Sequence, residues 1–273
     1  MSNPDPESDS EPELSTATLT ALQQFYTEKE SHQKAFEDLK AAAENDFDPD
    51  STEIPSLKYP LSMTAFTEDW NASQFWYTTA TATTLAHNLL QRTTSTTRIC
   101  VISAPSVFLQ LKNLIHAGRV QPAQLLLLEF DRRFEVFGSE FQYYDFREPV
   151  KLPGALRGRF DVFVVDPPFL SEECQTRTAL TVRWLARSWE GSGIGGVGGV
   201  REGAGGGKEE GLKMVVCTGE RMEGLICKLY KKVGVRTTDF VVEHAKGLSN
   251  EFRCYANFEC EEWKFVDGVV DSG

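Results

Sequence analysis

Long hydrophobic runs are absent from this 273-residue sequence, which contains no stretch of about 18 uncharged apolar residues. The sequence begins MSNPDPESDSEPE, whereas a signal peptide starts with basic residues and continues with an apolar stretch. The usual signals for membrane insertion and secretion are therefore missing. We expect a soluble intracellular protein that does not contact membranes.

Paired cysteines are absent as well. The six cysteines are scattered, with no Cys-x-x-Cys pair and no histidine cluster near them. Zinc sites and the disulfide frameworks of small secreted proteins depend on such spacings. We expect no metal site, and most of the cysteines should be small core residues in a reducing compartment.

The excess of basic residues that marks a nucleic-acid binder is also missing. Residues 1–53 carry 14 acids against 3 lysines, a net charge of −11. Residues 54–273 carry 26 acids against 25 basic residues, a net charge of −1. The acidic N-terminal part favours solubility, although it could also attract a basic partner. We do not expect nucleic acid as a partner.

Composition divides the chain into three parts. Residues 1–14 are rich in Pro, Asp, Glu and Ser, which predicts a disordered acidic tail. Residues 15–60 should form an N-terminal helical arm and a linker. Apolar residues recur near helical spacing from Ser15 to Asn45, which predicts one amphipathic helix, or two short ones, packed on another part of the protein. Residues 61–273 should form the main domain.

A glycine-rich segment interrupts the main domain. Eleven of the 21 glycines lie in residues 191–211, a composition typical of a flexible coil. A phosphate-binding glycine loop lies between a strand and the helix that follows it, whereas this segment lies between a helix predicted from about Glu172 to Trp189 and the next strand. It is therefore interpreted as a surface insertion.

Short apolar runs, separated mainly by helical patterns, predict the fold of the main domain. The runs cover residues 98–103, 124–130, 141–146, 160–165, 213–219, 237–244 and 253–260. Strands that alternate with helices form a parallel sheet covered by helices on both faces. No helix separates the last two runs, which should pair as an antiparallel hairpin at the sheet edge. The prediction is an α/β, Rossmann-like fold with a mostly parallel seven-stranded sheet, as in class I methyltransferases that use S-adenosylmethionine.

Acidic residues follow the second and third predicted strands. In a parallel sheet the ligand lies at the carboxyl ends of the strands, so these acids should line a cofactor site. Glu129 is suited to accept hydrogen bonds from ribose hydroxyls, and we prefer it to Asp131, which could equally cap a helix that begins at Arg132. Asp145 could bind an adenine amino group, or it could form a turn.

The fourth predicted strand ends in the sequence DPPF, residues 166–169. Two consecutive prolines end a strand, because proline cannot donate a hydrogen bond to its neighbour. The Asp166 carboxylate and the Pro167 carbonyl could then orient one amine, while Pro168 continues the turn and Phe169 supplies an apolar wall. Alternatively, DPP could merely terminate the strand and leave Asp166 on the surface, but the acids at the other strand ends favour a catalytic role.

The motifs together resemble a known family. QFWY (74–77), SAPSV (103–107), EFDRRF (129–134), FQYYDF (141–146), DPPFLSEEC (166–174), CTG (217–219) and NEFRCY (250–255) are similar to those of protein-lysine methyltransferases that act on translation elongation factor 1-alpha, originally named N6-adenine methyltransferases. The resemblance spans about residues 60–260. It implies S-adenosylmethionine as cofactor, a lysine of the elongation factor as acceptor, and a cytoplasmic location.

Three other segments could take part in this site. Most class I enzymes have a Gly-x-Gly turn after the first strand, where this chain has SAPS, so Ser103, Ala104 and Pro105 should contact the cofactor through backbone groups or serine hydroxyls. Trp76 could cover the cofactor, but it could equally pack its helix onto the sheet. In NEFRCY, Asn250 and Glu251 could meet substrate, and Arg253 could be an ion-pair partner.

We therefore predict a monomeric protein-lysine N-methyltransferase. Two alternatives remain open. A nucleic-acid adenine methyltransferase would use the same DPPF motif on a flipped base, with Phe169 stacked on the ring, although the near-neutral main domain offers it little support. A non-catalytic binding module would keep the fold without methyl transfer, although the acids at positions 129, 145 and 166 argue against it.

Overall fold

The computed structural model describes residues 15–45, 59–69, 74–118, 124–189, 211–247 and 251–266. Four features predicted from the sequence fall wholly or mostly outside these residues. They are the acidic tail, most of the linker, the glycine-rich segment up to residue 210, and Asn250. Within the described ranges, no helix is long and apolar enough to span a membrane.

Seven strands form one sheet in the order β3-β2-β1-β4-β5-β7-β6. The first five pair in parallel, and β7 pairs antiparallel with both β5 and β6. The strands are β1 (Arg98–Ile102), β2 (Gln124–Glu129), β3 (Phe141–Tyr143), β4 (Val162–Val165), β5 (Lys213–Gly219), β6 (Arg236–Val241) and β7 (Phe252–Ala256). This arrangement confirms the predicted fold class, including the terminal antiparallel pair.

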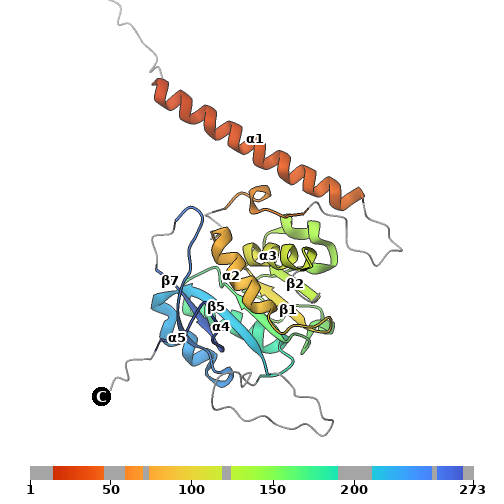
Figure 1. Ribbon diagram of the computed structural model, residues 1–273, viewed down its shortest axis with the longest axis vertical. Helices are drawn as coiled ribbons and strands as arrows, with labels where there is room; N and C mark the ends of the chain where they lie inside the picture. The colour runs from red at the N-terminus through yellow and green to blue at the C-terminus, as the bar shows by residue number, and fades with distance from the viewer. Residues whose placement is uncertain are drawn as a thin grey trace, which may run out of the picture.

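Helices cover both faces of the sheet, as Figure 1 shows. The α-helices are α1 (Thr16–Asn45), α2 (Thr79–Leu90), α3 (Pro105–His116), α4 (Glu172–Leu185) and α5 (Glu223–Leu229). The 3-10 helices are η1 (Met63–Ala65), η3 (Arg132–Glu140), η4 (Gly154–Leu156), η5 (Glu220–Met222) and η6 (Lys231–Val233). Helices α2 and α3 pack on one face of the sheet, and α4 and α5 pack on the other, which produces two separate apolar clusters.

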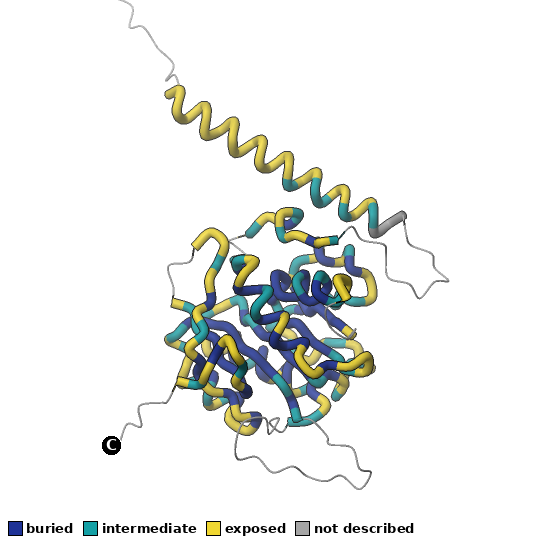
Figure 2. Tube along the Cα trace, in the orientation of Figure 1, coloured by how far each residue is buried: buried dark blue, intermediate teal, exposed yellow. Residues whose placement is uncertain are grey.

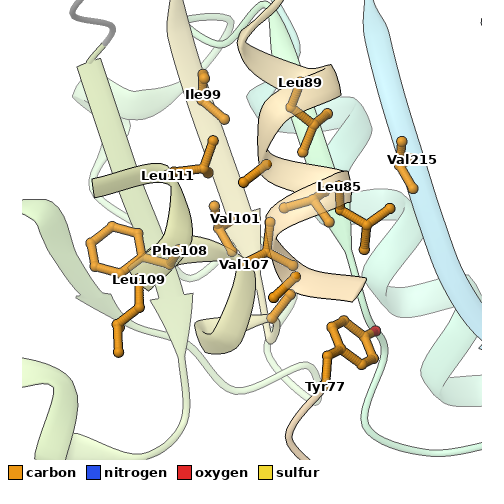
Figure 3. Close-up of a cluster of buried hydrophobic side chains, with 14 of the residues drawn as sticks. Tyr77, Leu85, Leu89, Ile99, Val101, Val107, Phe108, Leu109, Leu111 and Val215 are labelled. Carbon is orange, nitrogen blue, oxygen red and sulfur yellow. The ribbon is translucent and has the colours of Figure 1, made fainter. Parts of the chain in front are cut away.

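The cluster under α2 and α3 joins these helices to the central strands. Leu85 and Leu89 of α2 pack near Val101 of β1 and Val215 of β5 (Figure 3). All four are fully buried, and Figure 2 shows the sheet as the buried centre of the domain. Burying an aliphatic side chain of this size contributes roughly 1.5–3 kcal/mol, so the central strands form a rigid base for the groups at their ends.

Helix α4 begins with a cap that the sequence encodes. The Ser171 hydroxyl accepts a hydrogen bond from the Cys174 N–H, and Glu172 and Glu173 follow in the first turn, where carboxylates interact favourably with the helix dipole. The helix ends at Leu185, four residues before the predicted end at Trp189. The polypeptide turns there because the Arg159 and Phe160 N–H groups both donate to the Leu185 carbonyl.

Helix α1 is a single 30-residue helix that extends away from the domain (Figure 1). Its C-terminal half contacts the domain through Phe36 and Leu39, which pack against the first apolar cluster. Its N-terminal half is exposed along its whole length (Figure 2). The expected packing onto another part of the protein is therefore found for one half of the helix and not for the other.

Candidate active site

A cavity of about 600 Å³ opens where the parallel strands end. Because these strands run in one direction, their carboxyl ends bring residues distant in sequence to the same edge of the sheet. The ten residues that the sequence predicted as catalytic or cofactor-binding all line this cavity, namely Trp76, Ser103, Ala104, Pro105, Glu129, Asp145, Asp166, Pro167, Pro168 and Phe169. Tyr77, Phe146, Arg221 and His244 also line it, although the sequence did not single them out. Glu251 and Arg253 of the NEFRCY segment do not line it.

Asp166 lies at the inner wall, directly after β4. Its N–H donates to the Ile102 carbonyl at 2.9 Å, which extends the β1–β4 pairing by one residue and fixes the backbone. Its Oδ2 accepts a hydrogen bond from the Tyr77 hydroxyl at 2.5 Å. Desolvation, together with the neighbouring Glu129 charge, raises the pKa of Asp166 to about 8, although the hydrogen bond from Tyr77 acts in the opposite direction. This carboxyl group is therefore far more basic than an ordinary aspartate.

Tyr77 reaches Asp166 from the segment that precedes α2. Its N–H donates to the Ser106 hydroxyl at 3.2 Å, and its ring lies 5.1 Å from the His244 ring, centroid to centroid. Figure 3 shows Tyr77 at the end of the apolar cluster, beyond Leu85 and Val107. Burial raises the pKa of Tyr77 well above its ordinary value, so its hydroxyl keeps its proton and acts as a donor to Asp166.

Trp76 has a mainly structural environment. Its indole N–H donates to the Phe66 carbonyl at 2.8 Å, and its ring lies edge-on to Phe134 with the centroids 6.2 Å apart. Of the two interpretations that the sequence left open, packing describes the observed contacts of this ring. The hydroxyl that contacts Asp166 comes from the next residue of the QFWY segment, Tyr77, which the sequence did not single out.

Glu129 is buried at the end of β2. Its Oε1 accepts hydrogen bonds from the N–H groups of Phe130 at 2.9 Å and Asp131 at 3.2 Å. Desolvation raises the pKa of Glu129 to about 7, although these two backbone donors lower it. The backbone contacts involve only one carboxylate oxygen, so Oε2 is the oxygen more available to a ligand.

Asp131 has a different role from Glu129. Its Oδ1 caps η3 by accepting from the Arg133 N–H, and its Oδ2 accepts from Gln74 Nε2 at 2.9 Å. It also forms an ion pair with the Arg133 guanidinium at 2.6 Å. Although burial acts against it, these bonds hold the pKa of Asp131 below its usual value. Asp131 does not line the cavity, which supports the choice of Glu129.

The turn after β1 has the strained backbone that glycine usually occupies. Ser103 has a φ of +55°, in the left-handed region, and its N–H donates to the Leu128 carbonyl at 2.9 Å. Ala104 is the N-cap residue of α3 and has no side-chain capping bond, and Pro105 occupies the first turn. The first residues of α3 and its N-cap residue line the cavity, so the N-terminal end of this helix lies at the cavity wall.

Asp145 forms a turn at the end of β3. Its Oδ1 accepts from the Arg147 N–H at 2.9 Å and from Arg147 Nε at 3.2 Å. These bonds match the turn-forming interpretation, while the side chain remains on the cavity wall. The other carboxylate oxygen takes no part in the two bonds, so a ligand contact is compatible with them.

Aromatic rings form the outer wall. Phe169 is exposed and lies against Phe146 with ring centroids 5.6 Å apart. The Phe169 carbonyl accepts from Gln175 Nε2 at 3.1 Å, so α4 holds the end of the DPPF segment in place. Arg253 of β7 does not line the cavity and is paired with Glu220 at 2.5 Å, as the ion-pair interpretation of Arg253 expected.

The residues that line the cavity fit S-adenosylmethionine, which contains ribose hydroxyls, an adenine ring and an amino-acid carboxylate. The volume lies within the range of small-molecule sites. Glu129 can accept from hydroxyls, and the uncapped end of α3 suits an anion. Among the residues that the structure describes, no cluster of three or more side chains could hold a metal ion.

Comparisons with known proteins identify the family. A family model described as probable N6-adenine methyltransferase matches residues 68–260. The protein-lysine N-methyltransferase EFM5 of Saccharomyces cerevisiae is 38% identical over 93% of this chain and 94% of its own. The EEF1A lysine methyltransferase 1 of Gallus gallus is 35% identical over 93% and 97%, and that of Homo sapiens is 33% identical over 93% and 96%. With this similarity added to its sheet order and its DPPF cavity, the chain belongs to this family and is a class I methyltransferase.

Proposed function

We propose that this protein transfers methyl groups from S-adenosylmethionine to a lysine of translation elongation factor 1-alpha. The main observation behind this proposal is the hydrogen bond from Tyr77 to Asp166. The Asp166 carboxyl group has a raised pKa and lines the same cavity as Glu129. The names of the similar proteins support a lysine of this factor as the acceptor. We propose the cytoplasm as the location and a monomer as the working form.

The cofactor would be held at the β1, β2 and β3 ends of the cavity. In this proposal Glu129 Oε2 accepts from the ribose hydroxyls, Asp145 accepts from the adenine amino group, and the backbone of the Ser103–Pro105 turn approaches the amino-acid part. Bound there, S-adenosylmethionine supplies the activated methyl group. One oxygen of Glu129 is already occupied by backbone donors, so a single oxygen rather than two would serve the ribose.

Asp166 would bind the acceptor amine. Tyr77 occupies Oδ2, so Oδ1 is left to accept a hydrogen bond from the lysine nitrogen. The Tyr77 hydroxyl fixes the orientation of the Asp166 carboxyl group. A lysine nitrogen bonded to Oδ1 would therefore keep its lone pair pointed in one direction. Such positioning accounts for much of enzymatic rate acceleration. Pro167 would add its carbonyl as a second acceptor, and Pro168 would keep this turn rigid.

Asp166 would also help to remove the proton from lysine. The transfer needs a neutral amine, yet lysine has a pKa of about 10.4. An aspartate at its ordinary value of 3.8 lies nearly 7 pKa units below lysine, whereas Asp166 at about 8 lies only about 2 units below it. Moving a proton from lysine to Asp166 therefore costs less free energy than moving it to an ordinary aspartate. Burial thus makes the Asp166 carboxylate a stronger base than the carboxylate of an exposed aspartate.

Phe169 and Phe146 would contact the alkyl part of the lysine side chain. Their rings form an apolar wall next to the DPPF turn, and moving the four-carbon aliphatic chain of lysine from water to this wall is favourable, at about 0.8 kcal/mol for each buried methylene. A nucleic-acid substrate is not favoured, because residues 54–273 have a net charge of −1 and the similar proteins named above are lysine methyltransferases by name.

One experiment separates these substrates. The purified protein is incubated with labelled S-adenosylmethionine and a lysate from cells that lack it, with and without nuclease. We expect one labelled protein band at the size of elongation factor 1-alpha that survives nuclease treatment. Label that disappears with nuclease would refute the proposal in favour of a nucleic-acid substrate. A labelled protein of another size would refute the elongation factor as acceptor.

A further inference from the structure

Only the C-terminal half of helix α1 contacts the described part of the main domain. Near its C-terminal end, the Phe36 ring lies 5.8 Å from the Phe66 ring, and His32 Nδ1 forms a hydrogen bond with the Thr64 carbonyl. These contacts fall beside η1, and Phe66 in turn stacks on Phe134 of η3 at 4.3 Å. The C-terminal half of α1 is thus fixed to the domain through apolar contacts.

The N-terminal half exposes four large apolar side chains. Leu19 is 53% exposed, Leu22 36%, Phe25 59% and Tyr26 56%. Residues 19, 22 and 26 follow the i, i+3, i+7 spacing of one helix side, and residue 25 lies beside them. Single exposed apolar residues are ordinary, but a stripe of four within eight residues marks an interaction surface. Most of the stability of a helix in a protein comes from packing of its apolar face, so a partner on this stripe would stabilise the exposed half of α1.

Charge indicates the kind of partner. The first 53 residues carry 14 acids against 3 lysines, a net charge of −11. A second copy would place two such segments together, and nucleic acids and most membrane surfaces are also anionic, so all three would be repelled. A basic protein surface is complementary both to this charge and to the apolar stripe.

The attachment of α1 places such a partner beside the cavity. Ala65 at the end of η1 is four residues from Asp69, which lines the cavity, and four residues span at most about 14 Å. Helix η3 begins two residues after Phe130, which also lines the cavity. Residues 19–26 lie 10–17 positions before Phe36, about 15–26 Å along the helix, a distance that a substrate of domain size bound to the stripe can span to bring its lysine to the cavity.

We propose that the N-terminal half of α1 is a docking surface for a basic region of the protein substrate, outside the active site. The identity of this substrate rests on the proposed function. In this arrangement the stripe of Leu19, Leu22, Phe25 and Tyr26 supplies apolar contact, and the net negative charge of the first 53 residues favours a basic partner over other proteins. The arm raises affinity for the whole substrate without taking part in methyl transfer.

The test compares a whole substrate with a fragment. The double variant Leu22→Gln, Phe25→Gln keeps good helix formers at exposed positions. Leu180→Gln is the matched control, because Leu180 is 50% exposed on α4, which packs on the opposite face of the sheet. Kinetics are measured with full-length elongation factor 1-alpha and with a short peptide that contains the lysine methylated in it, and circular dichroism checks helix content.

We expect the double variant to raise KM for the full-length factor at least fivefold, with kcat and the peptide kinetics unchanged and with no effect from the control variant. An unchanged KM would overturn the docking surface, and so would a wild-type dimer in sedimentation that the double variant converts to a monomer. If the wild-type protein methylates neither substrate, the proposed function fails instead, which separates the two failures.

Discussion

The Tyr77 hydroxyl lies 2.5 Å from Oδ2 of Asp166, a contact that joins residues 89 positions apart in the chain. Tyr77 precedes α2, and Asp166 directly follows β4. The bond leaves one carboxyl oxygen for an acceptor amine and lowers a pKa that burial raises. Tyr77 is thus placed to act through Asp166, as a residue that positions the carboxyl group.

Tyr77→Phe should slow methyl transfer and change its pH dependence. A hydrogen bond to a charged group is worth roughly 1.5–3 kcal/mol, so kcat should fall about tenfold or more. Without this donor the pKa of Asp166 rises further, and the acidic limb of the kcat profile should move to higher pH. Tyr230→Phe is the control, because the Tyr230 hydroxyl is buried without a partner among the described residues and lies in the other apolar cluster. A loss of activity with an unmoved pH profile would contradict the positioning role.

Glu129→Ala should weaken cofactor binding. The carboxylate is proposed to accept hydrogen bonds from the ribose, so its removal should cost roughly 1.5–3 kcal/mol in calorimetry. Because the pKa of Glu129 is about 7, wild-type affinity should also increase as the pH rises through 7, and this increase should be missing from the variant. Equal affinities in a folded variant would show that Glu129 does not bind the cofactor.

Ser103→Gly should stabilise the protein and leave cofactor affinity within about twofold. The left-handed backbone at φ +55° costs a residue with a side chain about 1–2 kcal/mol, and glycine avoids this cost at a smaller loss of chain entropy. The net gain in unfolding free energy should be about 0.5–1 kcal/mol, measured by denaturant titration. A large fall in cofactor affinity would assign the contact to the Ser103 hydroxyl rather than to the backbone.

Asp166→Asn should stabilise the ligand-free protein more at pH 8 than at pH 5. The folded pKa of Asp166, about 8, lies above its unfolded value of about 3.9, so the folded state binds more protons and loses stability as pH rises between these values. Asparagine cannot ionise and escapes this loss. Since 1 kcal/mol shifts the melting temperature of a domain of this size by about 2–4 °C, the advantage of the variant should grow by at least about 3 °C. Glu148→Gln, in an exposed pair with Lys151, is the control. An advantage independent of pH would contradict the raised pKa.

Most of the fold could be predicted because its signals are local. Each of the seven apolar runs became a strand, and the missing helix before the last run identified the antiparallel pair. The position of β7 between β5 and β6 could not be predicted, because strand order at the edge depends on pairing between distant segments. The end of α4 was also placed too late, since the bonds that stop it come from Arg159 and Phe160.

The residues that line the cavity could be predicted as a group because the carboxyl ends of parallel strands lie at the same edge of the sheet. Tyr77 was missed because it precedes a helix and not a strand end, and because its hydroxyl acts on a residue 89 positions away. The one available signal was its place in QFWY, where an aromatic with a hydroxyl stands beside two without one. The sequence instead favoured its neighbour Trp76 as a cofactor contact, although the Trp76 indole N–H donates to the Phe66 carbonyl inside the protein.

The central claim is that Asp166 orients the acceptor amine and does not hold the cofactor. The most direct test measures S-adenosylmethionine affinity and methyl transfer to elongation factor 1-alpha in the same preparations of wild type, Asp166→Ala and Asp166→Asn. We predict that Ala abolishes transfer while affinity stays within a few-fold of wild type. Asn should retain more activity than Ala and less than wild type, because it keeps a neutral acceptor but loses the roughly twofold stronger charge-assisted bond. If Ala transfers methyl groups as fast as wild type, or loses affinity and transfer together, the account is wrong.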